Sequence, residues 1–425
     1  MQLSNSGRVV LIDDKAEEIE PLLVLLGKQN VPYLYFDGAL DNLPETPPEG
    51  VRFVFLDIEL GSKAVGIKNQ ASALTGVLSK VVSASNGPYV IIFWTRHKEV
   101  IEQILENCNK KSISPVAWID LDKPKLVSKK DNKYDLAEIM GKLDKKLSKI
   151  GAFYLYVQWE NILNSAGKQF VHDFSGVVDT GTDWTKKTSE LFYALYKSYV
   201  EKNVLHEQTE QFKCACHVMN QSFFDLLQNY TATKLELPEG FTLSHGKVER
   251  NTLSKLNTSL LINEGLLDRP STGYVYKEIN RSLLASLSKS LFKKDKQPAD
   301  MILCKIILTP ECDLARNKTL ITKKEEDGQP VEYKIHRSVY GVLFPCVDDQ
   351  KDNRSGKGSP AQFDIGPIWY QNKIYQIIIH FLTISTQNEK KIKGKPLFAL
   401  KRNLIFDLQS KAANHVNRLG SFQLS

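Results

Sequence analysis

The stretch "RVVLIDD" at residues 8–14 joins a short apolar run to two adjacent acidic residues, Asp13 and Asp14. A short continuous run of Val, Leu and Ile is typical of a strand buried on both faces of a sheet. Such strands occur in parallel sheets, whose ligands bind outside the carboxyl ends of the strands. The two carboxylates that follow this run are therefore the first candidates for a functional site.

Similar apolar runs recur to about residue 125, with helical patterns between most of them. The further runs are "VPYLYF" at 31–36, "VRFVFLDI" at 51–58, "YVIIFW" at 89–94 and "PVAWIDL" at 115–121. Helices are expected over 17–30, 67–83 and 98–108, because apolar residues return there at helical spacing. This alternation predicts a doubly wound α/β domain with a five-stranded parallel sheet.

The remaining chain is long enough for further domains. At 425 residues, the protein exceeds the size of one ordinary core. Apolar residues at three- and four-residue steps predict a helical domain over 131–295. Short β-like runs separated by polar loops, with a last helix near 400–418, predict a small α+β or β-barrel-like domain over 296–425. The first domain is expected to span 1–130.

Bulk composition narrows the class of protein. With 42% hydrophobic and 25% charged residues, the chain is expected to be globular. The formal net charge of +7 permits an acidic partner but does not require nucleic acid, which is not an expected partner. Six scattered cysteines and the absence of an apolar run of about 18 residues argue against a secreted or membrane protein. We expect a soluble, cytoplasmic protein without a membrane partner.

Polar residues with complementary chemistry follow four of the predicted strands. Asp13 and Asp14 follow the first, Asp57 the third, Thr95 the fourth and Lys123 the fifth. Three crowded carboxylates repel one another unless a cation lies among them, and Mg²⁺ prefers such oxygen ligands. The Thr hydroxyl and the Lys ammonium are suited to the oxygens of a phosphoryl group. The set therefore suits phosphoryl transfer onto an aspartate.

In order and position, these elements resemble the receiver domain of two-component response regulators. The matching segments are "IDD" at 12–14, "LDIEL" at 56–60, "WTR" at 94–96 and "DKP" at 122–124. The resemblance implies a flavodoxin-like fold and phosphorylation of Asp57. It implies Mg²⁺ binding by Asp13, Asp14, Asp57 and the backbone carbonyl of Glu59, and a switch at Thr95. It also implies that Lys123 pairs with the phosphoryl oxygens and that the peptide bond between Lys123 and Pro124 is cis. Asp120 stands where many receivers carry a switch aromatic, and Trp118 has the same strand parity.

The chain as a whole, including "TPECDLA" at 309–315 and the late "LKRNLIFDLQSKAANHVNRLG", resembles the large response receiver proteins of bacterial phage-defence phosphorelays such as Detocs. This resemblance implies a phosphoprotein that takes phosphoryl groups from a histidine kinase. It implies a signalling relay or phosphate sink that acts on a downstream effector protein in antiviral defence. We expect no enzymatic activity beyond the receiver's own phosphorylation and dephosphorylation.

Three alternatives remain open on the sequence. Asp14 could cap the following helix without any metal. Cys312 and Cys346, with Asp313 or His336, could form a zinc or thiol site in a C-terminal effector enzyme or nuclease gated by the receiver. A basic run could serve a nucleic-acid-binding regulator; its residues are Lys390, Lys391, Lys393, Lys395, Lys401 and Arg402.

Overall fold

The computed structural model forms two compact units, Met1–Glu190 with Cys216–Ser244 and Leu191–Ala215 with His245–Ser425. Within the described part of the chain, no helix is long and apolar enough to cross a membrane. The structure describes residues 8–60, 66–94, 99–121, 136–147, 149–178, 181, 183–200, 207–238, 241–242, 246–265, 270–292, 297–298, 300–315, 320–324, 330–346, 359 and 361–417.

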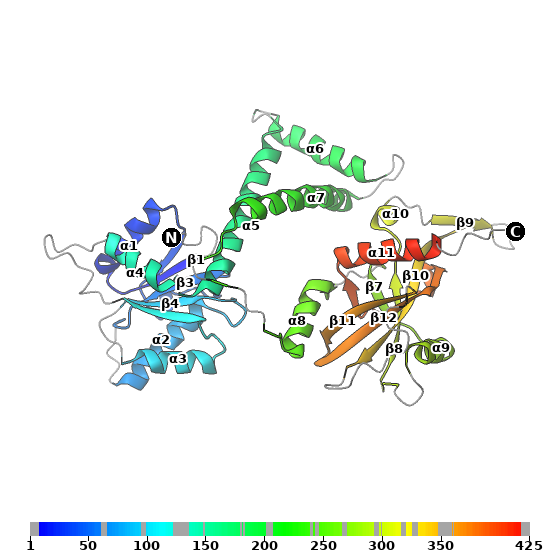
Figure 1. The fold of residues 1–425 in the computed structure, drawn as a ribbon. Coiled ribbons are helices and arrows are strands. Elements are labelled where there is room, and N and C mark those ends of the chain that lie inside the picture. Colours follow the sequence, from blue (N-terminus) through cyan, green and yellow to red (C-terminus); the bar gives the residue numbers. More distant parts are fainter. Residues whose placement is uncertain are drawn as a thin grey trace. The chain divides into compact units, whose positions relative to one another are not determined.

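The first unit contains a parallel sheet with the strand order β2-β1-β3-β4-β5 (Figure 1). Its strands are β1 (Arg8–Ile12), β2 (Tyr33–Phe36), β3 (Val51–Leu56), β4 (Val90–Trp94) and β5 (Ala117–Leu121). All four strand pairs are parallel. This is the flavodoxin-like order, which is also the receiver-like order. The predicted fold class of this part of the chain is confirmed.

Side chains that alternate along the strands build two separate cores, one on each face of the sheet. Leu11, Phe55 and Ile92 pack on one face with helix α1 (Ala16–Lys28). Ile12, Leu56 and their neighbours pack on the other face. There they meet helices α2 (Ile67–Val81) and α3 (Ile101–Lys110). Because side chains alternate with a period of two, continuous apolar strands fill both layers at once.

Two later helices also contribute to the first of these cores. Helix α4 (Leu136–Leu147) provides Leu143 and Leu147, and helix α5 (Gly151–Ser175) provides Phe153. Phe153 meets Phe53 edge to face, with ring centroids 5.4 Å apart. The sequence assigns residues 131–295 to a separate helical domain, whereas these segments pack on the parallel sheet. The three-domain division itself stays a prediction.

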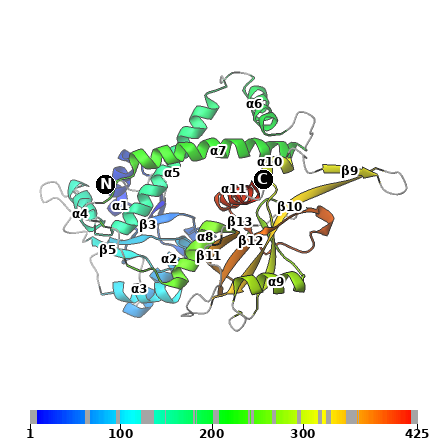
Figure 2. The ribbon, with the colours of Figure 1, turned by 45° about the vertical axis from the view of Figure 1, so that its right-hand side comes forward.

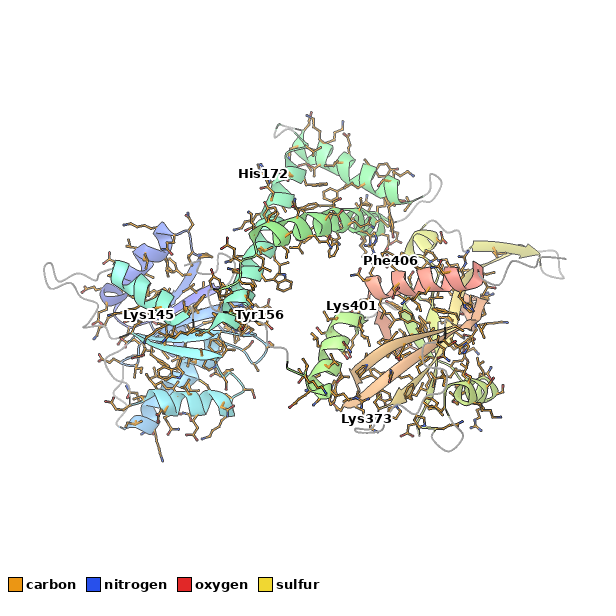
Figure 3. All side chains as sticks on the ribbon, viewed as in Figure 1. Lys145, Tyr156, His172, Lys373, Lys401 and Phe406 are labelled. Atoms are coloured by element: carbon orange, nitrogen blue, oxygen red, sulfur yellow. The ribbon has the colours of Figure 1, made fainter. Side chains whose placement is uncertain are left out.

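A helical region follows, as predicted. It consists of the 25-residue α5, α6 (Trp184–Tyr199) and α7 (Gln208–Lys234). Phe170 of α5 and Phe223 of α7 are in edge-to-face contact at 5.7 Å. Tyr156 and His172 are exposed on α5, where Figure 3 labels both. The apolar stripes found in the sequence are therefore only partly buried.

The second unit contains an antiparallel sheet with the order β11-β12-β10-β8-β7-β13-β6, and β9 pairs with β10 outside this path. Its strands are β6 (Ile262–Asn263), β7 (Tyr274–Lys277), β8 (Ile302–Ile307), β9 (Leu320–Lys324), β10 (Pro330–Pro345), β11 (Gln362–Tyr370), β12 (Lys373–Asn388) and β13 (Phe398–Leu400). Among the described strands, β11 and β6 are the two ends of the path. The sheet is thus open, and the α+β form of the prediction holds rather than the barrel-like one.

Helices cover both faces of this antiparallel sheet (Figures 1 and 2). Helix α11 (Arg402–Asn417) packs on one face through Ile405 and Leu408. Helix α9 (Arg281–Leu291) packs on the other through Leu287 and Leu291. Helices α8 (Arg250–Leu261) and α10 (Glu311–Ala315) also belong to this unit. Strands β6 and β7 lie within a segment that the sequence assigns to the helical region.

Candidate functional site

The parallel register of β1 and β3 places two of the predicted site residues level with each other. Ile12 lies opposite Leu56, so the next residues, Asp13 and Asp57, leave the sheet together. The Asp57 N–H donates to the carbonyl oxygen of Ile12 at 2.9 Å, and the Asp13 N–H donates to that of Phe36 at 3.1 Å. Backbone pairing thus continues up to both residues and fixes their backbones at the carboxyl edge.

Three of the predicted carboxylates converge at this edge. Asp13, Asp14 and Asp57 each offer an oxygen, and these oxygens lie within 4.8 Å of one another. Asp13 and Asp57 are buried, whereas Asp14 is exposed. We call these three residues the carboxylate cluster. Its exposed member leaves one side of the cluster accessible from solvent.

Local turns orient the two buried carboxylates. Asp13 Oδ1 accepts the Lys15 N–H at 2.9 Å, and Asp57 Oδ1 accepts the Glu59 N–H at 3.1 Å. Each aspartate therefore accepts from the N–H two residues later, as in an Asx turn. The N-cap residue of α1 is Lys15, and no side-chain capping bond is found there. The N-cap position thus lies one residue after Asp14, and a capping role for Asp14 stays a prediction.

Two side chains that the sequence analysis missed support this arrangement. The Tyr35 hydroxyl donates to the carbonyl oxygen of Asp13 at 2.8 Å, and the Gln70 amide donates to that of Ile58 at 2.9 Å. Burial, followed by the negative charge of Asp13, raises the pKa of Tyr35. Tyr35 therefore stays a neutral donor at neutral pH. Both bonds hold the loops that carry the carboxylates.

Lys15 supplies a cation beside the cluster that the sequence analysis also missed. Its Nζ lies 3.2 Å from Glu18 Oε1 and 3.8 Å from Glu59 Oε2. The hydrogen bond to Glu18, followed by the charges of Glu18, Glu59 and Asp14, raises the pKa of Lys15. Its side chain is half exposed, so this charge is screened by water. It only partly offsets the repulsion among three carboxylates.

The donor set of the carboxylate cluster fits Mg²⁺. All three donors are oxygens, and opposite ligands of octahedral Mg²⁺ lie about 4.2 Å apart. The three oxygens lie within 4.8 Å of one another, and side-chain rotation would have to bring those in adjacent positions to about 3 Å apart. A divalent cation there would also neutralise the like charges of two buried aspartates. The predicted additional ligand, the backbone carbonyl of Glu59, follows Asp57 in the same loop.

Two predicted site residues, Thr95 and Lys123, lie outside the described residues, as does the bond from Lys123 to Pro124. The strands before them are described. β4 ends at Trp94 beside β3, and β5 ends at Leu121 beside β4. The roles of Thr95 and Lys123 therefore stay predictions.

The position predicted for the switch aromatic carries an ion pair instead. Asp120 on β5 meets Lys146 on α4, with Lys146 Nζ 2.6 Å from Oδ1 and 2.7 Å from the carbonyl oxygen. Trp118, two residues earlier, is 46% exposed and meets Phe93 edge to face at 6.2 Å. These two hydrogen bonds therefore connect helix α4 to β5, the strand that precedes Lys123.

The C-terminal cysteine hypothesis is partly excluded. Cys346 follows β10, and its thiol lies 3.5 Å from Gln376 Oε1. His336 lies ten residues earlier (346 − 336) on the same strand, which places the two about 30 Å apart along the chain. They cannot bind one ion. The side chain of Cys312 lies outside the described residues, so its pairing with Cys346 or Asp313 stays untested.

Comparisons with known proteins add little. No family model and no curated protein matches the chain. Among solved structures, full-length FixJ from B. japonicum is 13% identical and covers 54% of this chain and 89% of its own, with a TM-score of 0.22. A cysteine-to-serine variant of RitR is 14% identical, and the match spans 56% of this chain and 93% of the RitR chain, with a TM-score of 0.19. Likeness this low carries no argument, and the receiver-like assignment rests on the strand order of the sheet.

Proposed function

We propose that the first unit is a phosphoacceptor that receives a phosphoryl group on Asp57 from the phosphohistidine of a histidine kinase. The observation that carries this proposal is the carboxylate cluster at the carboxyl edge of a receiver-like sheet. Asp57 directly follows β3, the middle strand of five, which lies between β1 and β4. A group bound at Asp57 is therefore near the residues that follow β1 and β4.

The transfer forms one bond and breaks another. A carboxylate oxygen of Asp57 attacks phosphorus, the P–N bond of the phosphohistidine breaks, and the leaving imidazole takes up a proton. The product is an acyl phosphate on Asp57. Mg²⁺, held by Asp13, Asp14, Asp57 and the carbonyl of Glu59, would neutralise charge on the transferring oxygens. The Glu59 N–H holds Asp57 in position throughout.

Thr95 and Lys123 complete the proposed site from the ends of β4 and β5. The Thr hydroxyl and the Lys ammonium would hold phosphoryl oxygens that the cation does not reach. We propose that the resulting change at β4 and β5 is passed to the rest of the chain, which acts as a relay or a phosphate sink. The support is the link from β5 to α4 through Asp120 and Lys146.

The direct test is incorporation of phosphate from a small phosphodonor in the presence of Mg²⁺. Asp57→Asn should abolish incorporation, because an amide oxygen is not a competent nucleophile. Asp41→Asn, at an exposed aspartate of the same unit, is the matched control and should be labelled like the unchanged protein. Equal labelling of both variants would refute the proposal.

A role in phage defence is a further proposal. It is supported by the resemblance of the late sequence motifs, and the chain has a second folded unit that the phosphoacceptor chemistry does not require. In cells that contain this protein together with its histidine kinase and its effector, Asp57→Asn should change the efficiency of phage plating. Asp41→Asn should not. If neither changes plating, the defence role is wrong even where Asp57 is labelled in vitro.

A further inference from the structure

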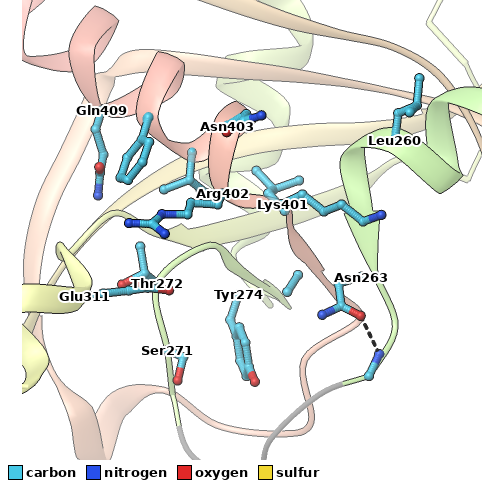
Figure 4. A pocket seen from close by; sticks show the side chains of 15 residues that line it. Leu260, Asn263, Ser271, Thr272, Tyr274, Glu311, Lys401, Arg402, Asn403 and Gln409 are labelled. Carbon is cyan, nitrogen blue, oxygen red and sulfur yellow. Dashed lines mark hydrogen bonds between the residues drawn. The ribbon is translucent and has the colours of Figure 1, made fainter. Parts of the chain in front are cut away.

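A cavity of about 560 Å³ in the second unit lies between the start of α11 and the turn that leads into β7 (Figure 4). Figure 4 shows the ends of Lys401 and Arg402 pointing to different sides of it, so its lining does not define one class of ligand. In the first unit, by contrast, a side chain outside the proposed ligand set has a defined contact with that set. The hydroxyl of Tyr35 donates to the carbonyl oxygen of Asp13.

Tyr35 lies on β2, at an edge of the parallel sheet, and is level with Leu11 of β1. Its ring is partly buried against the core that α1 shares with the sheet. Its hydroxyl extends beyond the end of β1 to the carbonyl oxygen of Asp13, at 2.8 Å. A strand that contributes no member of the carboxylate cluster thus contacts the cluster through one side chain.

Both backbone groups of Asp13 are bonded to β2. Its N–H donates to the carbonyl oxygen of Phe36 at 3.1 Å, and its carbonyl oxygen accepts the Tyr35 hydroxyl. Its carboxylate accepts the Lys15 N–H at 2.9 Å. Of these three bonds, the one from Tyr35 is donated by a side chain. It can therefore be removed by a substitution that leaves the backbone groups in place.

The carbonyl oxygen of Asp13 belongs to the peptide group that joins Asp13 to Asp14. This group is planar, so a bond that holds its oxygen also fixes the direction in which the Cα of Asp14 leaves it. The two residues provide two of the three oxygens of the carboxylate cluster. Rotation of this peptide group would turn the two carboxylates away from a common point. The Tyr35 hydroxyl therefore restrains how Asp14 lies relative to Asp13.

We propose that Tyr35 is a positioning residue of the Mg²⁺ site. Its hydroxyl holds the peptide group between Asp13 and Asp14 in the orientation that directs both carboxylates to one ion, and it acts through that peptide group rather than on the ion. Hydrogen bonds from the surroundings of a metal site orient the ligands in this way and raise metal affinity. The inference rests on the proposed phosphoacceptor function, because it takes the carboxylate cluster as the place of the ion.

The test measures binding of Mn²⁺ to the full chain by electron paramagnetic resonance, which reports the concentration of free ion. Mn²⁺ is the probe because it takes the same oxygen ligands as Mg²⁺ in the same octahedral geometry. Tyr35→Phe removes the hydroxyl and keeps the ring. It should weaken binding about three- to tenfold, as expected for the loss of one neutral hydrogen bond. Tyr33→Phe, two residues earlier on β2 at a side chain that is 39% exposed, is the matched control and should bind like the unchanged chain.

A double-mutant cycle separates positioning from a loss of stability. All affinities are measured well below the melting temperature of each variant, so that unfolding does not appear as weaker binding. In an Asp14→Ala background the peptide group no longer joins two ligands, so Tyr35→Phe should weaken binding less than about twofold. The same fold-change of affinity in both backgrounds would overturn the positioning role. An equal loss in Tyr33→Phe and Tyr35→Phe would overturn it as well.

The same titrations distinguish this inference from the proposed function. If the unchanged chain binds Mn²⁺ and Tyr35→Phe binds it as tightly, the role of Tyr35 is wrong and the metal site stands. If the unchanged chain binds no Mn²⁺, the proposed metal site is itself wrong, and the role of Tyr35 is wrong with it.

Discussion

Lys146 on α4 donates to both the carboxylate and the carbonyl oxygen of Asp120 on β5. Two bonds from one ammonium join a helix to the strand that precedes Lys123. Their side chains are 39% and 26% exposed, so we expect a coupling energy of only about 0.5–1.5 kcal/mol. A double-mutant cycle with Lys146→Met and Asp120→Asn, read as free energy of unfolding, measures it. Strict additivity of the two changes would show that the contact between the two side chains does not stabilise the fold.

A second ion pair joins β3 to α5. Arg52 donates to Glu160, with Nε 2.9 and 2.8 Å from the two carboxylate oxygens, and its Nη1 donates to the carbonyl oxygens of Asn86 and Pro88. The Arg52 side chain is only 11% exposed. Glu160→Gln removes the counter-charge of a mostly buried guanidinium and should destabilise the first unit by about 2–3 kcal/mol.

The matched control for this change is Glu106→Gln. Glu106 pairs with Lys110 one turn along α3, and both side chains are more than half exposed. Its loss should change the melting temperature of the first unit very little, because water screens an exposed pair. Thermal melts of both variants compare the two pairs directly. If Glu160→Gln melts at the same temperature as Glu106→Gln, the buried pair of Arg52 and Glu160 stabilises the first unit no more than the exposed pair does.

The sheet of the first unit can be predicted from the sequence because its buried strands are recognisable by their high content of apolar residues. Apolar residues fill most positions of these strands, with Arg8, Arg52 and Asp120 as exceptions. Because the strands are parallel, their carboxyl ends bring Asp13, Asp14 and Asp57 to one edge of the sheet. Tyr35, Lys15 and Gln70 were missed because their roles depend on register and loop geometry, which no local pattern encodes. The place of α4 was missed for a similar reason. Leu143 and Leu147 show helical spacing, but this spacing does not indicate which sheet the helix packs on.

Mg²⁺ should stabilise the first unit, and the carboxylate cluster predicts how Asp13→Asn changes this. The asparagine keeps an oxygen for the Lys15 N–H but removes one of three crowded charges. Without Mg²⁺ the variant should therefore melt at a higher temperature than the unchanged chain. With Mg²⁺ its melting temperature should rise less, because a ligand is lost. A variant that gains as much from Mg²⁺ as the unchanged chain would place the ion elsewhere.

Acid should destabilise the second unit through two buried histidines. Burial lowers the pKa of His336, despite Glu389 Oε2 at 3.5 Å, and burial followed by the charge of His415 lowers that of His380. The folded state then binds fewer protons than the unfolded state near their usual pKa of about 6.5. Stability is complete above that pH and is lost as pH falls below it, by at most about 1.4 kcal/mol per pH unit for each histidine.

His336→Gln should flatten this pH dependence, measured as the melting temperature of the second unit between pH 7 and pH 5. His172→Gln is the control, because His172 is exposed on α5. The control should keep the slope of the unchanged chain. A slope that His336→Gln leaves unaltered would assign the acid sensitivity to other groups.

The most direct test of the central claim is to locate the phosphoryl group on the full chain. After reaction with a phosphodonor and Mg²⁺, borohydride reduction converts an aspartyl phosphate to homoserine, which peptide mass spectrometry then places in the sequence. We predict homoserine at residue 57 in the unchanged chain, and its loss when Mg²⁺ is removed by a chelator. Homoserine at another aspartate, or none at residue 57 under conditions in which phosphate is incorporated, would contradict the account.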